Sequence, residues 1–117
     1  MKILSIEAFV PSGSSFAKSR QLFLELGFQI NWESPGYAGF QCDECRFILQ
    51  EYNVQEFAQN FMLSVKVSDI DEFRKGVLDK GLPEKYGIQI SEITKQPYGR
   101  ELNLIDLAGV CWHFVEQ

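Results

Sequence analysis

Long hydrophobic runs and an excess of basic residues are both absent from this 117-residue chain. No apolar run approaches the roughly 18 residues that cross a membrane as a helix. Sixteen acidic residues outnumber eleven basic ones, so the formal net charge is −5 and a phosphate backbone would on average be repelled. The first residues show no basic stretch followed by an apolar run and a cleavage site. We therefore expect a cytoplasmic protein that binds neither membrane nor nucleic acid.

Residues that carry catalysis are also scarce, with one histidine and three cysteines in the whole chain. An odd cysteine count offers no disulfide framework. There is no Gly-x-Ser-x-Gly sequence and no phosphate-binding loop. Cys42, Cys45, Cys111 and His113 leave a Cys3His zinc site open as an alternative, provided that the 43–44 turn approaches the last strand. A thioredoxin-like role is disfavoured because Cys42 and Cys45 lie between predicted strands rather than at a helix start.

What the chain does contain is a repeated order of elements, strand-helix-strand-strand-strand. Apolar alternation predicts strands, an apolar stripe at helical spacing predicts each helix, and Gly27 and Gly81 are suited to end the helices. The first half is predicted as strand 2–10, helix 16–26 and strands 28–33, 37–42 and 46–52. After a polar connector at 53–60, the second half is predicted as strand 61–67, a helix from 70, a loop at 82–87 and strands 88–96, 100–106 and 110–116.

These elements predict an α+β fold in which two βαβββ modules build one domain, 1–117. Module one spans 1–53, the linker 54–60 and module two 61–117. One helix covers one face of each sheet, and two curved mixed sheets side by side form a cup. Small proteins of this layout often complete such a cup by dimerising, so we expect a homodimer.

Strand alternation divides the side chains between the helix-covered core and the opposite face. The opposite face mixes apolar residues with scattered polar groups, which is typical of a ligand cavity or a dimer interface. We assign Leu4, Ile6, Ala8, Phe47, Leu49, Phe61, Leu63, Val65, Val67, Trp112 and Phe114 to the core. We assign Ile3, Ser5, Glu7, Phe9, Ile48, Gln50, Tyr52, Met62, Ser64, Lys66, Cys111, His113 and Val115 to the opposite face.

Several stretches of the sequence carry a resemblance to a known family. They are Pro97-Tyr98-Gly99-Arg100-Glu101, the following Asn103-Leu104-Ile105-Asp106, the closing Gly109-Val110-Cys111-Trp112-His113-Phe114, and the shorter Leu26-Gly27-Phe28 and Tyr37-Ala38-Gly39. Together they resemble bleomycin-resistance proteins, a non-catalytic branch of the glyoxalase/dioxygenase (vicinal oxygen chelate) superfamily. The resemblance implies paired βαβββ modules, a homodimer with two clefts, and binding of a bulky antibiotic by sequestration.

The resemblance also bears on a metal. Metal-dependent relatives carry one ligand on each of four strands, and the matching positions here are Ser5, Gln50, Met62 and His113. Only Gln50 and His113 are suited to a divalent ion, so we expect no metal and no cofactor. Glu7, two residues from Ser5, would supply a third ligand if the strand were aligned differently. A metal-dependent lyase, isomerase or dioxygenase of the same fold is therefore the alternative function.

The same resemblance implies a set of ligand-binding residues. Trp32, Tyr37 and Tyr98 match the aromatic rings that stack on the drug, and Gln50, Ser64, Lys66, Arg100 and His113 would contact its polar groups. Lys66 replaces an aromatic residue and would repel a cationic ligand. Two alternatives stay open. The aromatic residues could pack only a core or an interface, which would make the protein a ligand-free dimeric module. Arg100 and Glu101 could form an ion pair across strands instead of positioning a polar ligand group.

Overall fold

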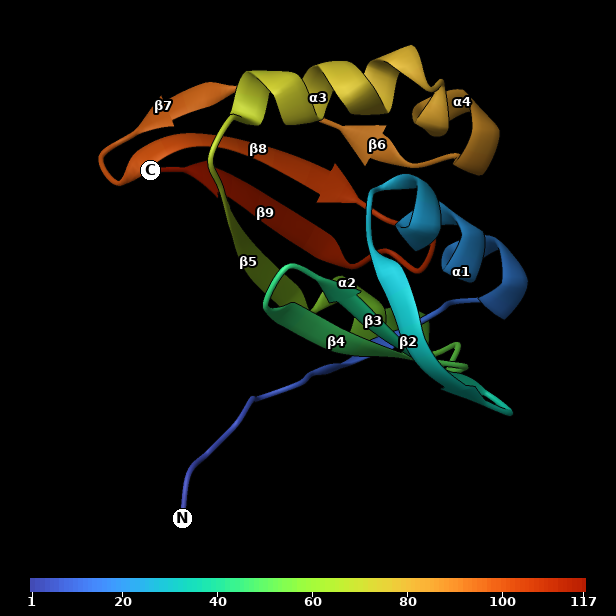
Figure 1. Cartoon of the computed structure of the whole chain (residues 1–117). Coiled ribbons are helices and arrows are strands. Elements are labelled where there is room, and N and C mark those ends of the chain that lie inside the picture. The colour runs from blue at the N-terminus through green and yellow to red at the C-terminus, as the bar shows by residue number, and fades with distance from the viewer. The chain divides into compact units, whose positions relative to one another are not determined.

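The computed structural model describes all 117 residues of the chain and divides them into two compact units, Met1–Val54 and Gln55–Gln117 (Figure 1). We call them unit 1 and unit 2. The sheet of unit 1 has the strand order β1-β4-β3-β2, in which β1 runs parallel to β4 and the other pairs are antiparallel. Its elements are β1 (Phe9–Pro11), α1 (Phe16–Glu25), β2 (Gln29–Ser34), β3 (Tyr37–Cys42) and β4 (Cys45–Gln50).

Helix α1 covers one face of the sheet of unit 1. It begins where the Ser15 hydroxyl accepts a hydrogen bond from the Lys18 backbone N–H at 3.2 Å, and Gly27 follows it with φ +107°. The Phe23 ring lies 5.7 Å from the Phe40 ring and 5.0 Å from the Phe47 ring, measured between centroids. The core of unit 1 is therefore an aromatic cluster between the helix and the sheet.

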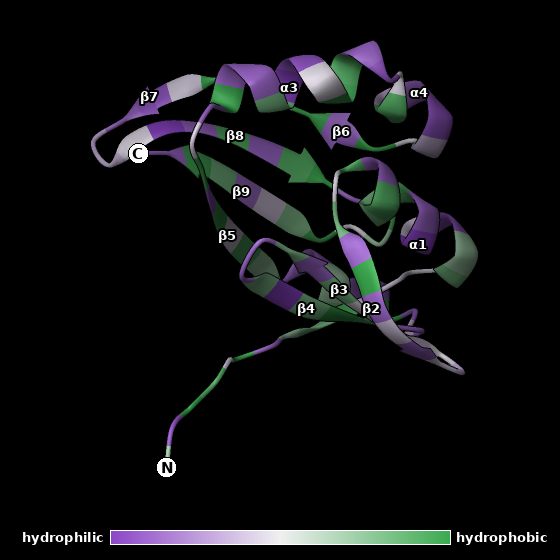
Figure 2. Cartoon of the chain, viewed as in Figure 1, coloured by the Kyte–Doolittle hydropathy of each residue, from purple (hydrophilic) through white to green (hydrophobic).

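Unit 2 has a larger sheet of order β5-β9-β8-β6, in which β5 runs parallel to β9 and β7 also pairs with β8. Hydrophobic and hydrophilic residues alternate along its strands (Figure 2). Its elements are α2 (Gln55–Gln59), β5 (Met62–Val67), α3 (Ile70–Asp79), α4 (Leu82–Tyr86), β6 (Gln89–Ile90), β7 (Thr94–Gln96), β8 (Gly99–Ile105) and β9 (Cys111–Glu116).

Helix α3 packs on the sheet of unit 2. Asp69 caps its start by accepting the Glu72 N–H at 2.9 Å, and the Phe73 ring stacks on the Phe114 ring with centroids 4.1 Å apart. None of the helices in the chain is long and apolar enough to span a bilayer. The predicted α+β architecture with two sheets is confirmed.

A buried carboxylate builds the β8–β9 turn. Asp106 Oδ1 accepts hydrogen bonds from the backbone N–H groups of Ala108, Gly109 and Val110 at 3.0, 3.1 and 3.0 Å, and Oδ2 accepts one from Trp112 Nε1 at 2.9 Å. Burial raises the pKa of Asp106, while these four donors act in the opposite direction. The turn is thereby tied to the Trp112 ring in the core.

The first predicted strand is wrong over most of its length. Only Phe9–Pro11 pairs with β4, the Ala8 carbonyl accepts one hydrogen bond from the Ile48 N–H at 2.9 Å, and the residues before it extend away from the sheet of unit 1 without secondary structure (Figure 1). Leu4 and Ile6, which we assigned to the core, are 88% and 90% exposed. Alternation marked residues 2–10 as a strand, but it contains no information on how many of them find a partner strand.

Three predictions in unit 2 also need correction. The predicted loop 82–87 contains helix α4, which has Pro83 in its first turn and left-handed glycines at both ends, Gly81 and Gly87. The connector 53–60 contains the short helix α2. The predicted strand 88–96 is two strands, β6 and β7, which pair with different parts of β8. Short elements of this kind are set by tertiary pairing rather than by periodicity.

Candidate functional site

The face of the sheet of unit 1 that α1 does not cover carries a row of directly paired residues. Trp32 pairs with Gly39, Gly39 with Ile48, and Ile48 with Phe9. Directly paired residues project to the same side of a sheet, so the row crosses all four strands. Tyr37 and Gln50, which pair with each other, lie one pleat further along. We call these residues, Phe9, Trp32, Tyr37, Ile48 and Gln50, the aromatic face.

Gly39 makes room for the Trp32 ring. A Cβ added at Gly39 would overlap Nε1 and Cδ1 of Trp32 and would come within 2.6 Å of Asn31 Oδ1. The indole therefore lies across the backbone of β3. A register shift between Ile30 and Trp32 leaves Asn31 unpaired and directs the following residue onto this face. Trp32 remains 40% exposed, so part of its ring is accessible.

Phe9 is an aromatic residue of this face that the sequence did not single out as a ligand contact. Its ring meets the Tyr37 ring edge to face, with centroids 6.2 Å apart and planes at 76°, and it is 52% exposed. Alternation in the sequence did assign Phe9 to the face opposite the core, on the same side as Ser5 and Glu7. The aromatic face thus presents three rings rather than two.

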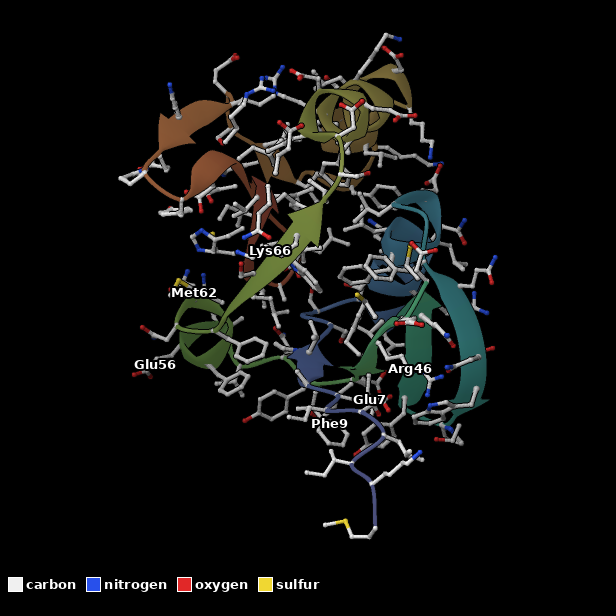
Figure 3. The ribbon with its side chains drawn as sticks, turned by 60° about the vertical axis from the view of Figure 1, so that its left-hand side comes forward. Glu7, Phe9, Arg46, Glu56, Met62 and Lys66 are labelled. Atoms are coloured by element: carbon white, nitrogen blue, oxygen red, sulfur yellow. The ribbon has the colours of Figure 1, made fainter.

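Unit 2 has a corresponding sheet face that α3 does not cover, and it is polar. Ser64 pairs with His113 and His113 with Asn103, while Lys66 pairs with Val115 and Val115 with Glu101. Met62 and Lys66 lie along β5 on this side (Figure 3). We call Ser64, Lys66, Glu101, Asn103, Cys111 and His113 the polar face.

Four side chains of unit 2 form a chain of hydrogen bonds. The Tyr98 hydroxyl donates to Glu101 Oε2 at 3.0 Å, Glu101 Oε1 lies 3.3 Å from His113 Nδ1, and His113 Nε2 lies 3.4 Å from Cys111 Sγ. A carboxylate beside Nδ1 favours the tautomer with the proton there, which leaves Nε2 to accept from the thiol. The hydrogen bond to Glu101 raises the pKa of Tyr98, and burial raises the pKa of Cys111. His113 is therefore held in place, and both end groups stay protonated at neutral pH.

Asn103 Oδ1 is buried and has no hydrogen-bond partner. It belongs to the residue that pairs directly with His113. Buried acceptors are nearly always satisfied in native proteins, by protein, water or ligand. The polar face therefore contains one buried acceptor, Asn103 Oδ1, that still needs a hydrogen-bond donor.

Arg100 lies on the other face of the sheet, under α3. Its guanidinium bonds Asp71 at 2.8 and 3.0 Å and Glu116 at 3.3 Å, and these partners raise its pKa. Arg100 forms an ion pair across strands with Glu116 of β9, whereas Glu101, which the sequence grouped with it, faces His113. Arg100 is therefore not part of the polar face, and we leave it out of the ligand contacts proposed below.

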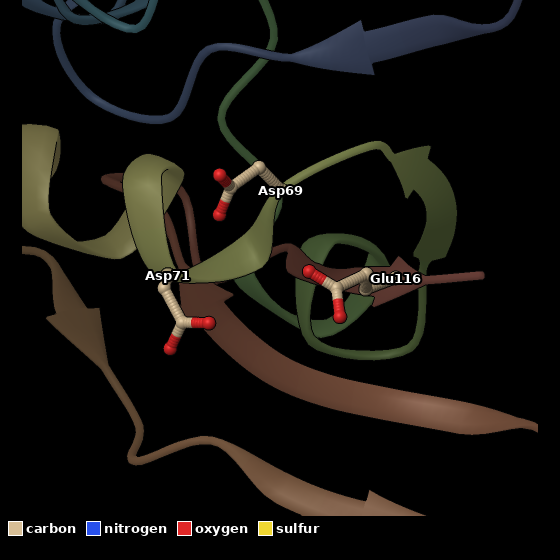
Figure 4. A group of neighbouring side chains, drawn as sticks. All are labelled: Asp69, Asp71 and Glu116. Atoms are coloured by element: carbon tan, nitrogen blue, oxygen red, sulfur yellow. The ribbon is translucent and has the colours of Figure 1, made fainter.

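Asp69, Asp71 and Glu116 form an acidic group beside Arg100 (Figure 4). Each carboxylate has a partner in the chain. Asp69 caps α3, Asp71 binds Arg100, and Glu116 Oε2 accepts the Ile70 N–H at 2.9 Å. These contacts join α3 to the sheet, so the acidic group has a structural role.

The positions that matched metal ligands differ in their surroundings. Ser5 lies in the exposed segment 1–8 and donates to Glu7 Oε2 at 2.7 Å. Met62 begins β5 and is exposed, Gln50 lies on the aromatic face, and both His113 nitrogens already have partners. Of the residues of the alternative zinc site, Cys42 and Cys45 face each other across the β3–β4 hairpin of unit 1, and Cys111 and His113 belong to unit 2.

Comparison with solved structures identifies the fold. The chain is 22% identical to the bleomycin-binding protein of bleomycin-producing Streptomyces verticillus in complex with copper(II)-bleomycin, over 100% of this chain and 98% of that one, with a TM-score of 0.80. It is 18% identical to a bleomycin resistance determinant encoded on the transposon Tn5, over 97% and 98% of the two chains, with a TM-score of 0.80. It is 17% identical to a putative glyoxalase family protein from Bacillus anthracis, over 100% and 98%, with a TM-score of 0.75.

The chain therefore has the vicinal oxygen chelate fold. Antibiotic-binding proteins and a glyoxalase-family protein both share it, so the fold alone does not separate binding from catalysis. No protein-family model and no curated protein sequence matches the chain.

Proposed function

We propose that this protein binds a small antibiotic-type molecule with a flat aromatic part and holds it without chemical turnover, as a cytoplasmic homodimer that needs no metal or cofactor. Bleomycin-resistance proteins are the precedent for this kind of binding. The ligand would stack on Trp32, Tyr37 and Tyr98, and Gln50, Ser64, Lys66 and His113 would contact its polar groups. To the stacking residues we add Phe9.

The observation that carries the proposal is the aromatic face. Phe9 and Trp32 are large apolar residues with about half of their surface exposed, and they lie in one row with Ile48 and beside Tyr37. Leaving such rings in water forgoes the free energy of burial, which is about 25 cal/mol for each Å². A flat ligand would recover it, because aromatic rings offer apolar surfaces for stacking.

The donor chemistry supports binding rather than metal catalysis. A thioether such as that of Met62 is a poor ligand for a hard divalent ion, and Ser5 offers only a neutral hydroxyl. His113 Nδ1 is engaged by Glu101 and Nε2 by Cys111. A metal-dependent lyase, isomerase or dioxygenase would need donors that these positions do not offer.

The polar face would discriminate between ligands by charge. Lys66 is an exposed cation on β5, and the Glu101 carboxylate lies in the same row of paired residues two strands away. A strongly cationic ligand would be repelled by Lys66, an anionic group would be attracted, and a neutral group would be neither attracted nor repelled by its charge. We therefore expect Lys66→Ala to tighten the binding of bleomycin.

Titration of the EDTA-treated protein with bleomycin tests the proposal, with heat measured by calorimetry and tryptophan emission recorded alongside. We expect saturation near one ligand per chain. Trp32→Ala should weaken binding by roughly 1–3 kcal/mol, the cost of truncating an aromatic anchor, which is about 5- to 150-fold in Kd. Trp32→Phe keeps a ring and should lose less.

Unchanged affinity in Trp32→Ala would remove that residue from the site. The metal content of untreated protein separates the alternatives. Stoichiometric metal together with no heat of drug binding would contradict sequestration and favour the enzyme. Neither metal nor drug binding would favour the ligand-free dimeric module.

A further inference from the structure

The hairpin between β3 and β4 ends in two cysteines that face each other. Cys42 pairs directly with Cys45 across the two-residue turn formed by Asp43 and Glu44, and both are free thiols. Directly paired residues project to the same side with Cβ atoms about 4.5–5.5 Å apart. A disulfide needs Cβ atoms about 3.5–4.5 Å apart and Cα atoms within about 7 Å. The first and last residues of a tight turn meet the Cα requirement. A small inward movement is therefore enough to join them.

We propose that Cys42 and Cys45 form a reversible intramolecular disulfide, so that the tip of this hairpin is a site of redox modification. The oxidant is a low-molecular-weight disulfide of the glutathione class. This inference does not depend on the ligand-binding activity proposed above. Disulfides in reducing compartments are usually transient and redox-sensing, which fits a pair at an exposed tip.

The two thiols have different roles in the reaction. Cys45 is exposed, so its thiolate attacks one sulfur of the small disulfide and releases one thiolate. Cys42 then loses its proton to solvent, its sulfur attacks the Cys45 sulfur, and the second small thiolate leaves. Overall, two protein thiols and one small disulfide give one protein disulfide and two small thiols.

Cys42 is placed to be the resolving thiol. It is half-buried, and its sulfur lies 3.9 Å from Asp43 Oδ2. Burial, followed by the charges of Asp43 and Cys45, raises the pKa of Cys42, so it stays a protonated thiol until Cys45 has reacted. The third cysteine, Cys111, belongs to unit 2, and its thiol is hydrogen-bonded to His113.

A path of hydrogen bonds leads from this turn to the aromatic face. Gln41 Nε2 donates to the Asp43 carbonyl at 2.9 Å, and Gln41 Oε1 accepts from Asn31 Nδ2 at 3.2 Å. Asn31 is the unpaired bulge residue directly before Trp32. Because a disulfide would draw the strand ends together and move the Asp43 carbonyl, oxidation should change the surroundings of the Trp32 ring.

The test equilibrates the full chain with reduced and oxidised glutathione, quenches it with acid and counts free thiols under denaturing conditions. We expect one thiol to remain of three after oxidation, an intact mass lower by two hydrogens, and full recovery with dithiothreitol. Cys111→Ser should lose both of its remaining thiols, whereas Cys45→Ser should form no intramolecular disulfide. Three surviving thiols, consumption of Cys111, or a disulfide between chains would overturn the proposal.

Tryptophan emission tests the path to the aromatic face without any ligand. Oxidation should shift the emission of the wild type, and Trp32→Phe should abolish the shift because only Trp112 remains. A disulfide that forms without any shift would overturn the connection to Trp32.

Discussion

At the scale of single residues, Gly39 is as important to the aromatic face as the rings themselves. Alternation along the sequence assigned Ile48 and Gln50 to one side of the sheet, and the family resemblance added Tyr37. It could not reveal that Trp32 lies across Gly39, because that depends on the bulge at Asn31, which breaks the alternation of β2. Bulges depend on the pairing of two strands and leave little trace in either strand alone.

Gly39→Ala should displace the Trp32 ring, since the added Cβ would occupy the same space. We expect a loss of stability of about 1–3 kcal/mol, which is usual for overpacking, together with a change in the Trp32 emission and weaker binding of bleomycin. Urea unfolding and emission spectra of the free protein measure the first two effects.

Gly76→Ala is the matched control, because Gly76 lies in α3 with no atom within 4 Å of an added Cβ. It should stabilise the protein by about 0.5–1 kcal/mol through the helix preference of alanine. If Gly39→Ala behaved like this control, the packing of Trp32 on Gly39 would not matter for stability or emission.

At the scale of elements, α3 is joined to the last hairpin by Arg100, which connects Asp71 of the helix with Glu116 of β9. Periodicity predicted this helix and its apolar stripe, because these features are local in sequence. It did not predict α4 or the division of 88–96 into β6 and β7. The strands β6 and β7 acquire their structure from β8, a strand that lies later in the chain.

The Asp71–Arg100 pair should make the stability of unit 2 depend on pH in the acidic range. The hydrogen bond from Arg100 lowers the pKa of Asp71 below its usual value. The stabilisation is therefore present above the pKa of the unfolded chain, about 3.9 for Asp, and is lost as the pH falls through the lower folded pKa. Asp71→Asn should flatten the dependence of the urea midpoint on pH below about 4.

Asp79→Asn removes the same charge at the other end of α3 and controls for net charge. A wild type and an Asp71→Asn variant with parallel pH profiles would show that Arg100 does not stabilise the ionised carboxyl.

At the scale of the whole molecule, residues 1–7 form a segment with exposed apolar side chains that pairs with no strand. Ile3, Leu4 and Ile6 are all largely exposed although the sequence predicted a strand there. Exposed apolar chain of this kind usually marks an interaction site. The homodimer proposed above would give this segment a second copy of the chain to pack on.

Deletion of residues 1–7 should convert the proposed dimer to a monomer, and Leu4→Glu combined with Ile6→Glu should do the same. Sedimentation velocity measures both. Ser5→Ala, in the middle of the same segment, should remain dimeric. A wild-type protein that sediments as a monomer at tens of micromolar would contradict the homodimer itself.

The parallel strand pairs have a consequence for how the chain is made. In each unit the first strand pairs with the last, Val10 with Leu49 in unit 1 and Leu63 with Trp112 in unit 2. Contacts between residues so far apart in sequence form late and slowly. A growing chain on the ribosome can therefore complete the sheet of unit 1 while unit 2 is still being made, and the sheet of unit 2 forms only after β9 has left the exit tunnel.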